Sequence, residues 1–489
     1  MRPVTMRDYR IFVIPFLFVL VVAGCASAAA AQPAPDTVRV TLTEAVQKAL
    51  DVSPEVDRRR AQQRFAEARR DRAEANRFLT DLSLDIASSF APGLDIPASN
   101  TRPENELYLN PDVENDWSLG ALRPFGRAEI VARQPIFTWG ELSGSIDAAR
   151  HGVDVESARV EQQALTVAAR TGEIYYNLLL TQALSRLAER TDEVVDRAKK
   201  EIQRLLDEGD ESVDQADLFQ TRITEEEVKR RTIEVEQNRK TAHSALRRQL
   251  FLPDGTVIVA AADELAPLNF SLHPDSLDHY IALGLNNRPE VEQAAAGVEA
   301  RAAQVDVAKS DYYPKVGVQA SLAQSVTLPE RPNPDNAFVG DSFMGTGTRT
   351  GLGITLDLNF RQTQARVEEA QAQLSEVKQQ QTAARQLVRF EVEEAYRNLI
   401  VAKAKVESRD RANKISGEWL RTEQIDFDLG FGDTENLVKA VRADIEAEAR
   451  YFEAVKAYNV AVLKLLRTTG TLTDRLRRGT LVETDDKQK

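Results

Sequence analysis

The sequence predicts a mainly α-helical chain with two structural repeats, in which a few strands contribute to a membrane β-barrel. The first observation is that residues 140–252 contain no proline and place apolar and small residues at steps of three and four, which is a helical period. A helix over residues 141–206 would be roughly 100 Å long, because each residue adds about 1.5 Å. Such a helix is typical of a coiled coil, a membrane bundle or a periplasmic tunnel.

The second observation is an internal repeat. The motif Tyr-Tyr-Asn-Leu at residues 175–178 returns as Tyr-Arg-Asn-Leu at residues 396–399, and Gly209 has its counterpart in Gly430. Both intervals equal 221 residues, and no proline follows Pro334. A repeat at a fixed interval indicates a duplicated architecture. We therefore expect each half to contain two long helices that turn at a glycine.

The third observation is a set of four segments that alternate apolar with polar residues, at 82–90, 130–137, 315–322 and 351–360. This alternation is typical of a strand with lipid on one side and water on the other. We expect Asp85, Asp357 and Asn359 to face the barrel lumen, although a merely solvated strand face would give the same pattern.

Four strands cannot close a membrane barrel, and an open sheet edge is not tolerated in lipid. Strands from several chains must therefore close the barrel together. Three chains would supply twelve strands and form the simplest ring, and a ring of four chains remains an alternative.

The composition argues against several classes of protein. The formal net charge is −13 and no basic stripe is concentrated anywhere, so we expect no nucleic-acid partner. One cysteine cannot form a disulfide, a zinc site or an iron–sulfur site, and the four histidines share no ligand spacing. Because no nucleophile motif is present, we expect neither an enzyme nor a bound metal or cofactor.

The N-terminus has the pattern of an export signal, which we assign to residues 1–24. Arginines at positions 2, 7 and 10 precede an apolar run at 11–22 that is too short for a typical spanning helix. Two cleavage sites compete: Val22-Ala23-Gly24-Cys25 resembles a lipobox with Cys25 as the lipidated residue, whereas Ala26-Ser27-Ala28 resembles an ordinary A-x-A site. No later segment is apolar enough for a transmembrane helix, so we expect any membrane span to be β.

The remaining elements divide the chain into two repeats. Residues 25–40 form a linker, and the first repeat covers residues 41–255. It contains a short helix at 44–52 with Thr43 as its cap and a helix at 53–78 that begins at Ser53-Pro54-Glu55, before the first strand pair and the long helices. Residues 256–275 form a connector. The second repeat covers residues 276–470, with helices at 278–287, 288–311, 363–429 and 435–466, and a polar, frayed tail follows at 471–489.

These features resemble the TolC-like outer-membrane efflux channel family over about residues 41–466. The resemblance rests on the paired starts Ser53-Pro54-Glu55 and Arg288-Pro289-Glu290, and on the strand exit Gln134-Pro135-Ile136-Phe137 before Gly140. It also rests on the closing helix, from Gly430 through Asn436-Leu437-Val438-Lys439-Ala440 to Tyr458 and Leu463. The order, duplication and spacing of these motifs make the assignment specific.

The resemblance implies a homotrimer with a 12-stranded β-barrel in the outer membrane of a Gram-negative bacterium and a long α-helical barrel in the periplasm. The inner end would bind a periplasmic adaptor protein and an inner-membrane pump of the RND or ABC class, which drives the passive exit of drugs, small molecules or polypeptides. The alternative is a periplasmic coiled-coil adaptor that bridges the two membranes. That alternative would leave the two pairs of alternating strands unexplained.

The resemblance also places the turns at Gly209 and Gly430 at the periplasmic tip, where a family channel narrows and an adaptor binds. The candidate tip residues are Gly209, Asp210, Glu211, Asp214 and Asp217 in the first repeat, and Gly430, Asp433, Glu435, Asn436 and Lys439 in the second. In the best-known family member aspartates form a constriction here, and the matching positions in this chain are Asn436 and Lys439. Inward carboxylates repeated around a ring would attract cations, whereas helix-capping acids would face water.

Overall fold

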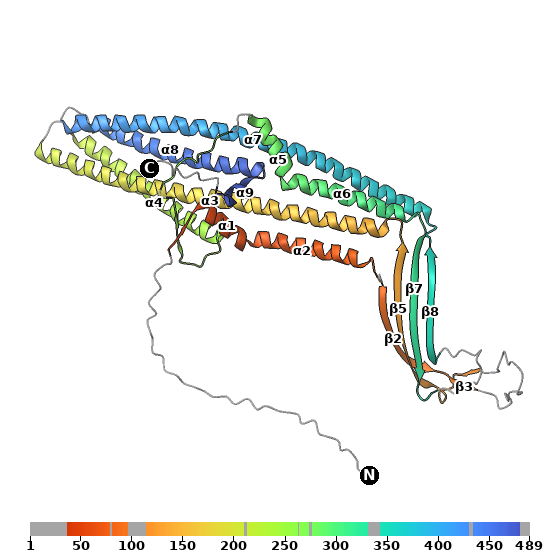
Figure 1. Ribbon diagram of the computed structural model, residues 1–489. Helices are drawn as coiled ribbons and strands as arrows, with labels where there is room; N and C mark the ends of the chain where they lie inside the picture. The colour runs from red at the N-terminus through yellow and green to blue at the C-terminus, as the bar shows by residue number, and fades with distance from the viewer. Residues whose placement is uncertain are drawn as a thin grey trace, which may run out of the picture.

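The computed structural model describes residues 37–78, 81–95, 114–209, 213–262, 264–272, 276–330, 343–429 and 434–479. The molecule is elongated, with a four-stranded sheet at one end, a layer of long helices, and small elements packed around the middle of that layer (Figure 1). Of the helices in these ranges, none combines the length and hydropathy that a membrane span requires.

The same series of elements occurs twice along the chain. The first series is α1 (Leu42–Val52), α2 (Pro54–Ala75), β2 (Asp81–Ala91), β5 (Arg123–Phe137), α3 (Glu141–Glu208) and α4 (Gln215–Gln249). The second series is α5 (Ser276–Asn287), α6 (Pro289–Ser310), β7 (Lys315–Thr327), β8 (Gly345–Thr355), α7 (Phe360–Asp428) and α8 (Thr434–Thr468). The longest helices contain 68 and 69 residues, and the helices after them contain 35 each. The duplication expected from the 221-residue interval is therefore present in the fold.

The helices form one layer with two open edges. Near the sheet the order of contacting helices is α2, α3, α6 and α7, and in the other half α4 replaces α2 while α8 replaces α6. The sheet follows the same order, β2-β5-β7-β8, and all its neighbours are antiparallel. One edge of the chain therefore consists of α2, α4 and β2, and the other edge consists of α7 and β8.

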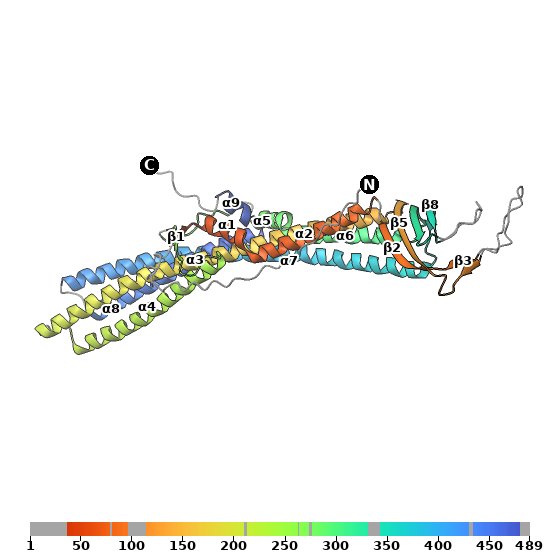
Figure 2. The same cartoon turned by 90° about the horizontal axis from the view of Figure 1, so that it is seen from below.

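The main hydrophobic core lies at the middle of the helix layer. The repeated motif is at its centre, because Tyr175, Tyr176 and Leu178 of α3 and Leu399 of α7 are all buried. The helices α1, α5 and α9 (Leu472–Arg477) pack against α3 and α7 and stand to one side of the layer (Figure 2). A small parallel pair, β1 (Thr37–Val40) with β6 (Val257–Ala260), joins them. The motif is therefore repeated at positions whose side chains pack in the core.

The start of α1 differs from the expectation from sequence. The cap is Thr41, and the prediction of Thr43 is wrong. The hydroxyl of Thr41 accepts a hydrogen bond from the Glu44 N–H at 3.2 Å, and the Glu44 carboxylate accepts one from the Thr41 N–H at 2.8 Å. This reciprocal pair satisfies two N–H groups at the helix start, which a cap at position 43 would leave exposed.

The connector and the start of the tail are more ordered than the sequence suggests. The side chain of Asn459, which is fully buried in α8, accepts from the Leu268 N–H at 2.8 Å and donates to the Ala266 carbonyl at 2.9 Å. Leu472, the first residue of α9, is also fully buried, so the expectation of a frayed tail from residue 471 is wrong for its first part. Six residues are too few to show a helical period, and tertiary contacts hold this helix in place.

We expect Gly470→Ala to destabilise the chain more than Gly479→Ala. Both glycines have a positive φ, +72° and +67°, so both alanines meet a similar backbone penalty of roughly 1–2 kcal/mol. A Cβ at position 470 would also lie 2.5 Å from the carbonyl oxygen of Asn287, whereas a Cβ at position 479 meets nothing within 4 Å. Urea unfolding of the two variants measures the difference, and equal midpoints would contradict the contact with Asn287.

Candidate functional site

The sheet has one apolar face. Its register aligns Leu84 with Ile130 and Ile130 with Leu322, so these side chains form a row across three strands near the middle of the sheet. In the single chain they are 60%, 45% and 47% exposed. Each of the four strands contains at least 11 residues, which is enough for a tilted membrane strand of about 9–11 residues. This face has the composition and the length that contact with lipid requires.

The opposite face of the sheet carries charged side chains. Asp85 lies on this face, directly across from Glu129 in the register. Arg127 pairs with Glu129 at 2.9 Å, and Arg133 pairs with Asp81 at 2.5 Å. Arg127 and Glu129 were not expected on this face, because the strand was predicted to start at residue 130, whereas β5 begins at residue 123. The face is therefore more strongly charged than Asp85 alone suggested.

Asp357 and Asn359 do not lie on a strand. β8 ends at Thr355 and α7 begins at Phe360, so the expectation of a strand over residues 351–360 is wrong beyond residue 355. The carboxylate of Asp357 accepts a hydrogen bond from the Asn359 N–H at 3.0 Å and pairs with Arg366 of α7 at 3.4 Å. This bond from a side chain to the N–H two residues later forms a turn, which ends the strand although the apolar alternation continues.

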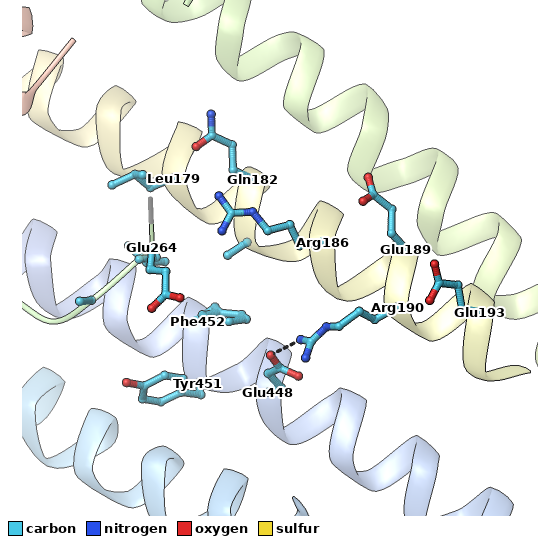
Figure 3. Close-up of a pocket in the computed structure, with 13 residues that line it drawn as sticks. Leu179, Gln182, Arg186, Glu189, Arg190, Glu193, Glu264, Glu448, Tyr451 and Phe452 are labelled. Atoms are coloured by element: carbon cyan, nitrogen blue, oxygen red, sulfur yellow. Dashed lines mark hydrogen bonds and ion pairs between the residues drawn. The ribbon is translucent and has the colours of Figure 1, made fainter. Parts of the chain in front are cut away.

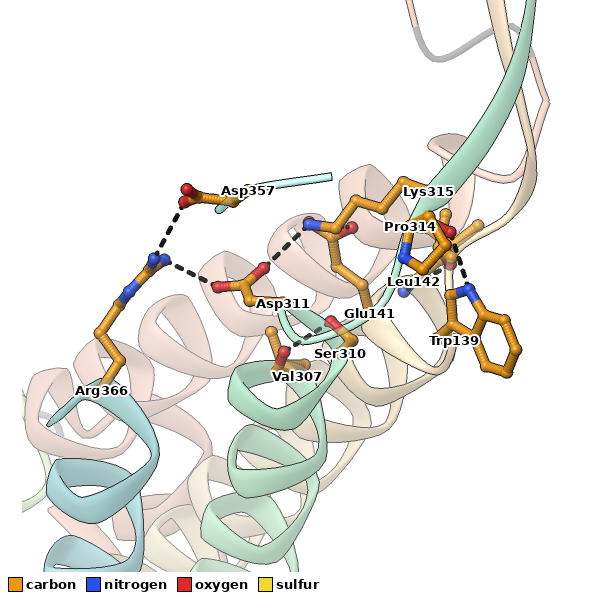
Figure 4. A network of polar contacts seen from close by, with 11 residues as sticks. Trp139, Glu141, Leu142, Val307, Ser310, Asp311, Pro314, Lys315, Asp357 and Arg366 are labelled. Carbon is orange, nitrogen blue, oxygen red and sulfur yellow. Dashed lines mark hydrogen bonds and ion pairs between the residues drawn. The ribbon is translucent and has the colours of Figure 1, made fainter. Parts of the chain in front are cut away.

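A charged network connects the sheet to the helices. Lys315, the first residue of β7, lies 2.8 Å from Glu141 at the start of α3 and 2.9 Å from Asp311 after α6 (Figure 4). Arg366 of α7 lies 2.7 Å from the same Asp311. The indole N–H of Trp139 donates to the carbonyl that precedes Lys315, at 2.7 Å. The network therefore fixes three helices relative to one strand.

The turn of the first repeat lies at the far end of the helices from the sheet (Figure 1). Gly209 ends α3 with a φ of +72°, and its N–H donates to the Leu206 carbonyl at 3.2 Å. Asp214 caps α4 and forms a reciprocal pair with Asp217, with distances of 3.0 and 2.9 Å. Both aspartates are thus helix caps in this structure. Asp210 and Glu211 lie outside the described residues.

The second turn is only partly described. Gly430 and Asp433, like Cys25, lie outside the described residues. Glu435 pairs with Lys439 on the next turn of α8 at 2.6 Å, and both side chains are about half exposed. Asn436 is exposed beside them. Across the described ranges, no group of three or more histidine, cysteine, aspartate or glutamate side chains is arranged to hold a metal ion.

Ion pairs join the helices between the core and the tip. Glu225 of α4 lies 2.8 Å from both Lys199 of α3 and Lys229, and hydrogen bonds from these two lysines lower the pKa of Glu225 to about 2. The carboxylate therefore keeps its charge at any physiological pH. Arg190 of α3 pairs with Glu448 of α8 at 2.5 Å, beside a hollow of about 650 Å³ that the connector borders (Figure 3). The ion pair of Arg190 with Glu448 connects the first repeat to the second.

A larger hollow of about 1360 Å³ lies between α2, α3, α6 and α7. The charged residues that line it are Arg59, Arg69, Arg72, Arg159, Arg301, Glu156 and Glu290. α2 contains seven arginines and five acidic residues, and none of the three arginines of α2 that line the hollow was singled out from the sequence. The averaged net charge concealed them. Positions 69 and 72 are three residues apart and therefore neighbours on the helix surface, and this spacing was a signal that could have shown two of them.

The comparison with known families agrees with this architecture. The family model described as outer membrane efflux protein matches residues 126–250 and 281–471, which is more than half of the chain. The chain therefore belongs to the outer membrane efflux protein family, and the predicted family resemblance is confirmed. No curated protein matches the chain.

Solved outer-membrane proteins share the fold. The MtrE outer membrane channel of Neisseria gonorrhoeae, in its open state, is 14% identical with a TM-score of 0.70, over 88% of this chain and 89% of that one. VceC of Vibrio cholerae is 16% identical with a TM-score of 0.67, over 88% and 96%. The CmeC outer membrane channel of Campylobacter jejuni is 14% identical with a TM-score of 0.67, over 91% and 90%. At these identities the likeness shows the fold.

We expect Leu84→Arg to impair insertion and Ser83→Arg to be tolerated. Leu84 belongs to the apolar row near the mid-height of the sheet, and an arginine near the bilayer midplane costs about 2–4 kcal/mol. Ser83 is its neighbour on the polar face, so the control adds the same charge to the same strand. Unfolding of each variant from lipid vesicles with urea measures the cost. Equal loss in both variants would contradict the assignment of the two faces.

Proposed function

We propose that this chain is one of three subunits of an outer-membrane channel, through which an inner-membrane pump expels solutes by way of a periplasmic adaptor. The observation that carries the proposal is that the helix layer and the sheet end at the same two open edges. β2 and β8 run in opposite directions, so β8 of one copy can pair with β2 of the next and keep the antiparallel order. A closed ring of copies leaves no open edge in lipid.

Apolar side chains at the two helix edges support ring closure. They are between 41% and 68% exposed, and they are Phe219, Ile223 and Ile233 of α4 and Ile415, Trp419 and Ile425 of α7. α4 starts at the tip and α7 ends there. Ile223 lies eight residues after the first residue of α4 and Trp419 nine before the last residue of α7, so both are at a similar height. Contact between copies would remove both side chains from water.

The position of the small elements indicates which side faces the channel. α1, α5 and α9 add bulk to one side of the layer only (Figure 2). In a ring of such layers there is more room outside than inside. We therefore place the side with the larger hollow towards the channel. The polar sheet face with Asp85 would line the barrel, and the apolar face with Leu84 would contact lipid.

The remaining assignments follow from the family. The tip at Gly209 and Gly430 would bind the adaptor, the pump would be of the RND or ABC class, and drugs, small molecules or polypeptides would leave through the channel. The outer membrane of a Gram-negative bacterium would hold the trimer, with Cys25 as a lipid anchor once residues 1–24 are removed. The mass of the mature N-terminus distinguishes this anchor from cleavage after Ala28. The alternative is a periplasmic adaptor, which would expose the apolar face of the sheet to water.

A disulfide between Ile223→Cys and Trp419→Cys tests the ring and counts its members. α4 and α7 lie at opposite edges of one chain, so this bond can form only between copies. With Cys25→Ser as background, oxidation of the purified protein should give a ladder of linked chains that ends at three. A ladder that ends at four would correct the copy number, and unlinked chains would contradict the ring.

A second cysteine pair controls for random collision. Leu387→Cys is also on α7 and exposed, but it lies 32 residues from Trp419, or about 50 Å along the helix. Combined with Ile223→Cys it should give no ladder. A ladder as strong as that of the first pair would show that the links report collision.

We expect Gly209→Val to impair export and adaptor crosslinking while trimers still form. A β-branched residue strains the left-handed backbone at this turn, whereas Gly209→Asn tolerates the same φ and should keep export. A Cβ at this position meets nothing within 4 Å, so the substitution acts through the backbone. Export, adaptor crosslinking and trimer yield are measured together. If Gly209→Val lowers export, adaptor crosslinking and trimer yield in parallel, this glycine acts only as a helix cap.

A further inference from the structure

The larger hollow has a positive surplus in an acidic chain. The whole chain carries a formal net charge of −13, yet five arginines and only two glutamates line this hollow. Glu156 already pairs with Arg159 at 2.5 Å, and Glu290 pairs with Arg288 at 2.7 Å. Neither glutamate is therefore available to neutralise the other arginines.

Four guanidinium groups in the hollow have no carboxylate partner among the described residues: Arg59, Arg69, Arg72 and Arg301. Two of them are held by amide groups, since Arg59 donates to Gln62 at 3.0 Å and Arg301 donates to Gln373 of α7 at 2.8 Å. The Nε of Arg59 is buried and bonds to no other described residue. Guanidinium groups only donate hydrogen bonds, so these side chains suit a ligand with anionic oxygens.

The hollow lies on the side of α3 that faces away from α9. Successive helix residues are about 100° apart, so Arg159 and Glu161 point in nearly opposite directions. Arg159 lines the hollow. Leu165, which lies one turn after Glu161 on the same face of α3, is buried in the core cluster that contains Leu472 and Leu476 of α9, so this face of α3 is turned towards α9. In the proposed ring, the arginines would therefore face the channel.

The hollow also offers apolar contact. Phe65 of α2 and Leu387 of α7 line it and are 67% and 56% exposed, and Val377 lies on the same surface. Arginine side chains beside exposed apolar groups match a solute that has both an anionic group and an apolar body. A simple inorganic anion would interact with the arginine side chains but not with the apolar groups.

We propose that the hollow formed by α2, α3, α6 and α7 is a cationic section of the channel that receives amphipathic organic anions. This inference rests on the proposed channel function and names the class of its substrates. Repetition around the ring brings the unpaired arginines of several copies to one level of the channel. The positive potential there raises the local concentration of anions and lowers that of cations.

Charged thiol reagents measure this potential directly, whether or not the tip is open. Ala66 lines the hollow, and with Cys25→Ser the variant Ala66→Cys has a single thiol. The full chain in detergent is treated with the anionic sulfonatoethyl and the cationic trimethylammonioethyl methanethiosulfonate. The ratio of the anionic to the cationic rate should fall by about tenfold when Arg69, Arg72 and Arg301 are replaced by glutamine. The difference should shrink at 1 M salt, where the Debye length is about 3 Å.

Arg64→Gln is the matched control, because Arg64 is exposed on α2 but does not line the hollow. It should leave the rate ratio unchanged. A ratio that is equal in the parent and the triple variant at low salt would overturn the inference.

Conductance separates this inference from the proposed function. In planar bilayers the parent should pass benzenesulfonate better than benzyltrimethylammonium, and the triple variant should lose this preference. Conduction without the preference would overturn the inference alone. If the parent chains also form no linked ring, the proposed function falls, and the inference falls with it.

Discussion

The two open edges of this chain constrain almost everything else in its structure. A strand edge carries a row of unpaired N–H and C=O groups, and each one costs several kcal/mol when it is left unsatisfied in lipid. The edges at β2 and β8 are continuous with the helix edges at α2, α4 and α7, so in the proposed ring one kind of contact between copies would satisfy both. In the proposed channel, the sheet of four strands is therefore one part of a larger membrane structure.

Because the outer edges of the chain are open, the two repeats are joined to each other along the inner edges of the sheet and of the helix layer. β5 pairs with β7 and α3 packs against α6, so the repeats meet along the full height of the layer. The charged network around Lys315 reinforces that seam at the sheet, and the pair of Arg190 with Glu448 reinforces it towards the tip. If the proposed ring is correct, the seam within the chain and the contact between chains alternate around it.

The sequence predicted the long elements well and their ends less well. The ends of α3, α7 and α8 fall within about three residues of the expected positions, because a helical period over dozens of residues is unambiguous. Strand ends depend on the partner strand. β5 starts at Arg123 because β2 pairs with it as far as that residue, while β7 pairs with it from Phe125 onwards. β8 stops at Thr355 because Asp357 forms a turn. The β1–β6 pair spans more than 200 residues of sequence and has no local signal.

The candidate site was harder to predict, because a charged residue in a sequence does not show which partner neutralises it. Acids near the two turns drew attention because of the family resemblance, yet Asp214 and Asp217 are bound to backbone N–H groups and Glu435 to Lys439. The number of acidic residues in a segment does not show that they form hydrogen bonds and ion pairs with their neighbours. The arginines of α2 were overlooked for the opposite reason, since a negative total charge hides a positive face.

Distance keeps these two charged regions independent of each other. The hollow reaches Gln162 of α3, and the tip begins at the end of that helix at Glu208, so roughly 70 Å of helix separates them. The Debye length at physiological salt is about 8 Å, so charges at the tip are fully screened at the hollow. Acidic residues at the tip therefore cannot cancel a positive potential between α2 and α7. A solute that passes through the proposed channel would meet the two fields one after the other, and the cationic section would set the preference for anions near the sheet whatever charge the tip presents.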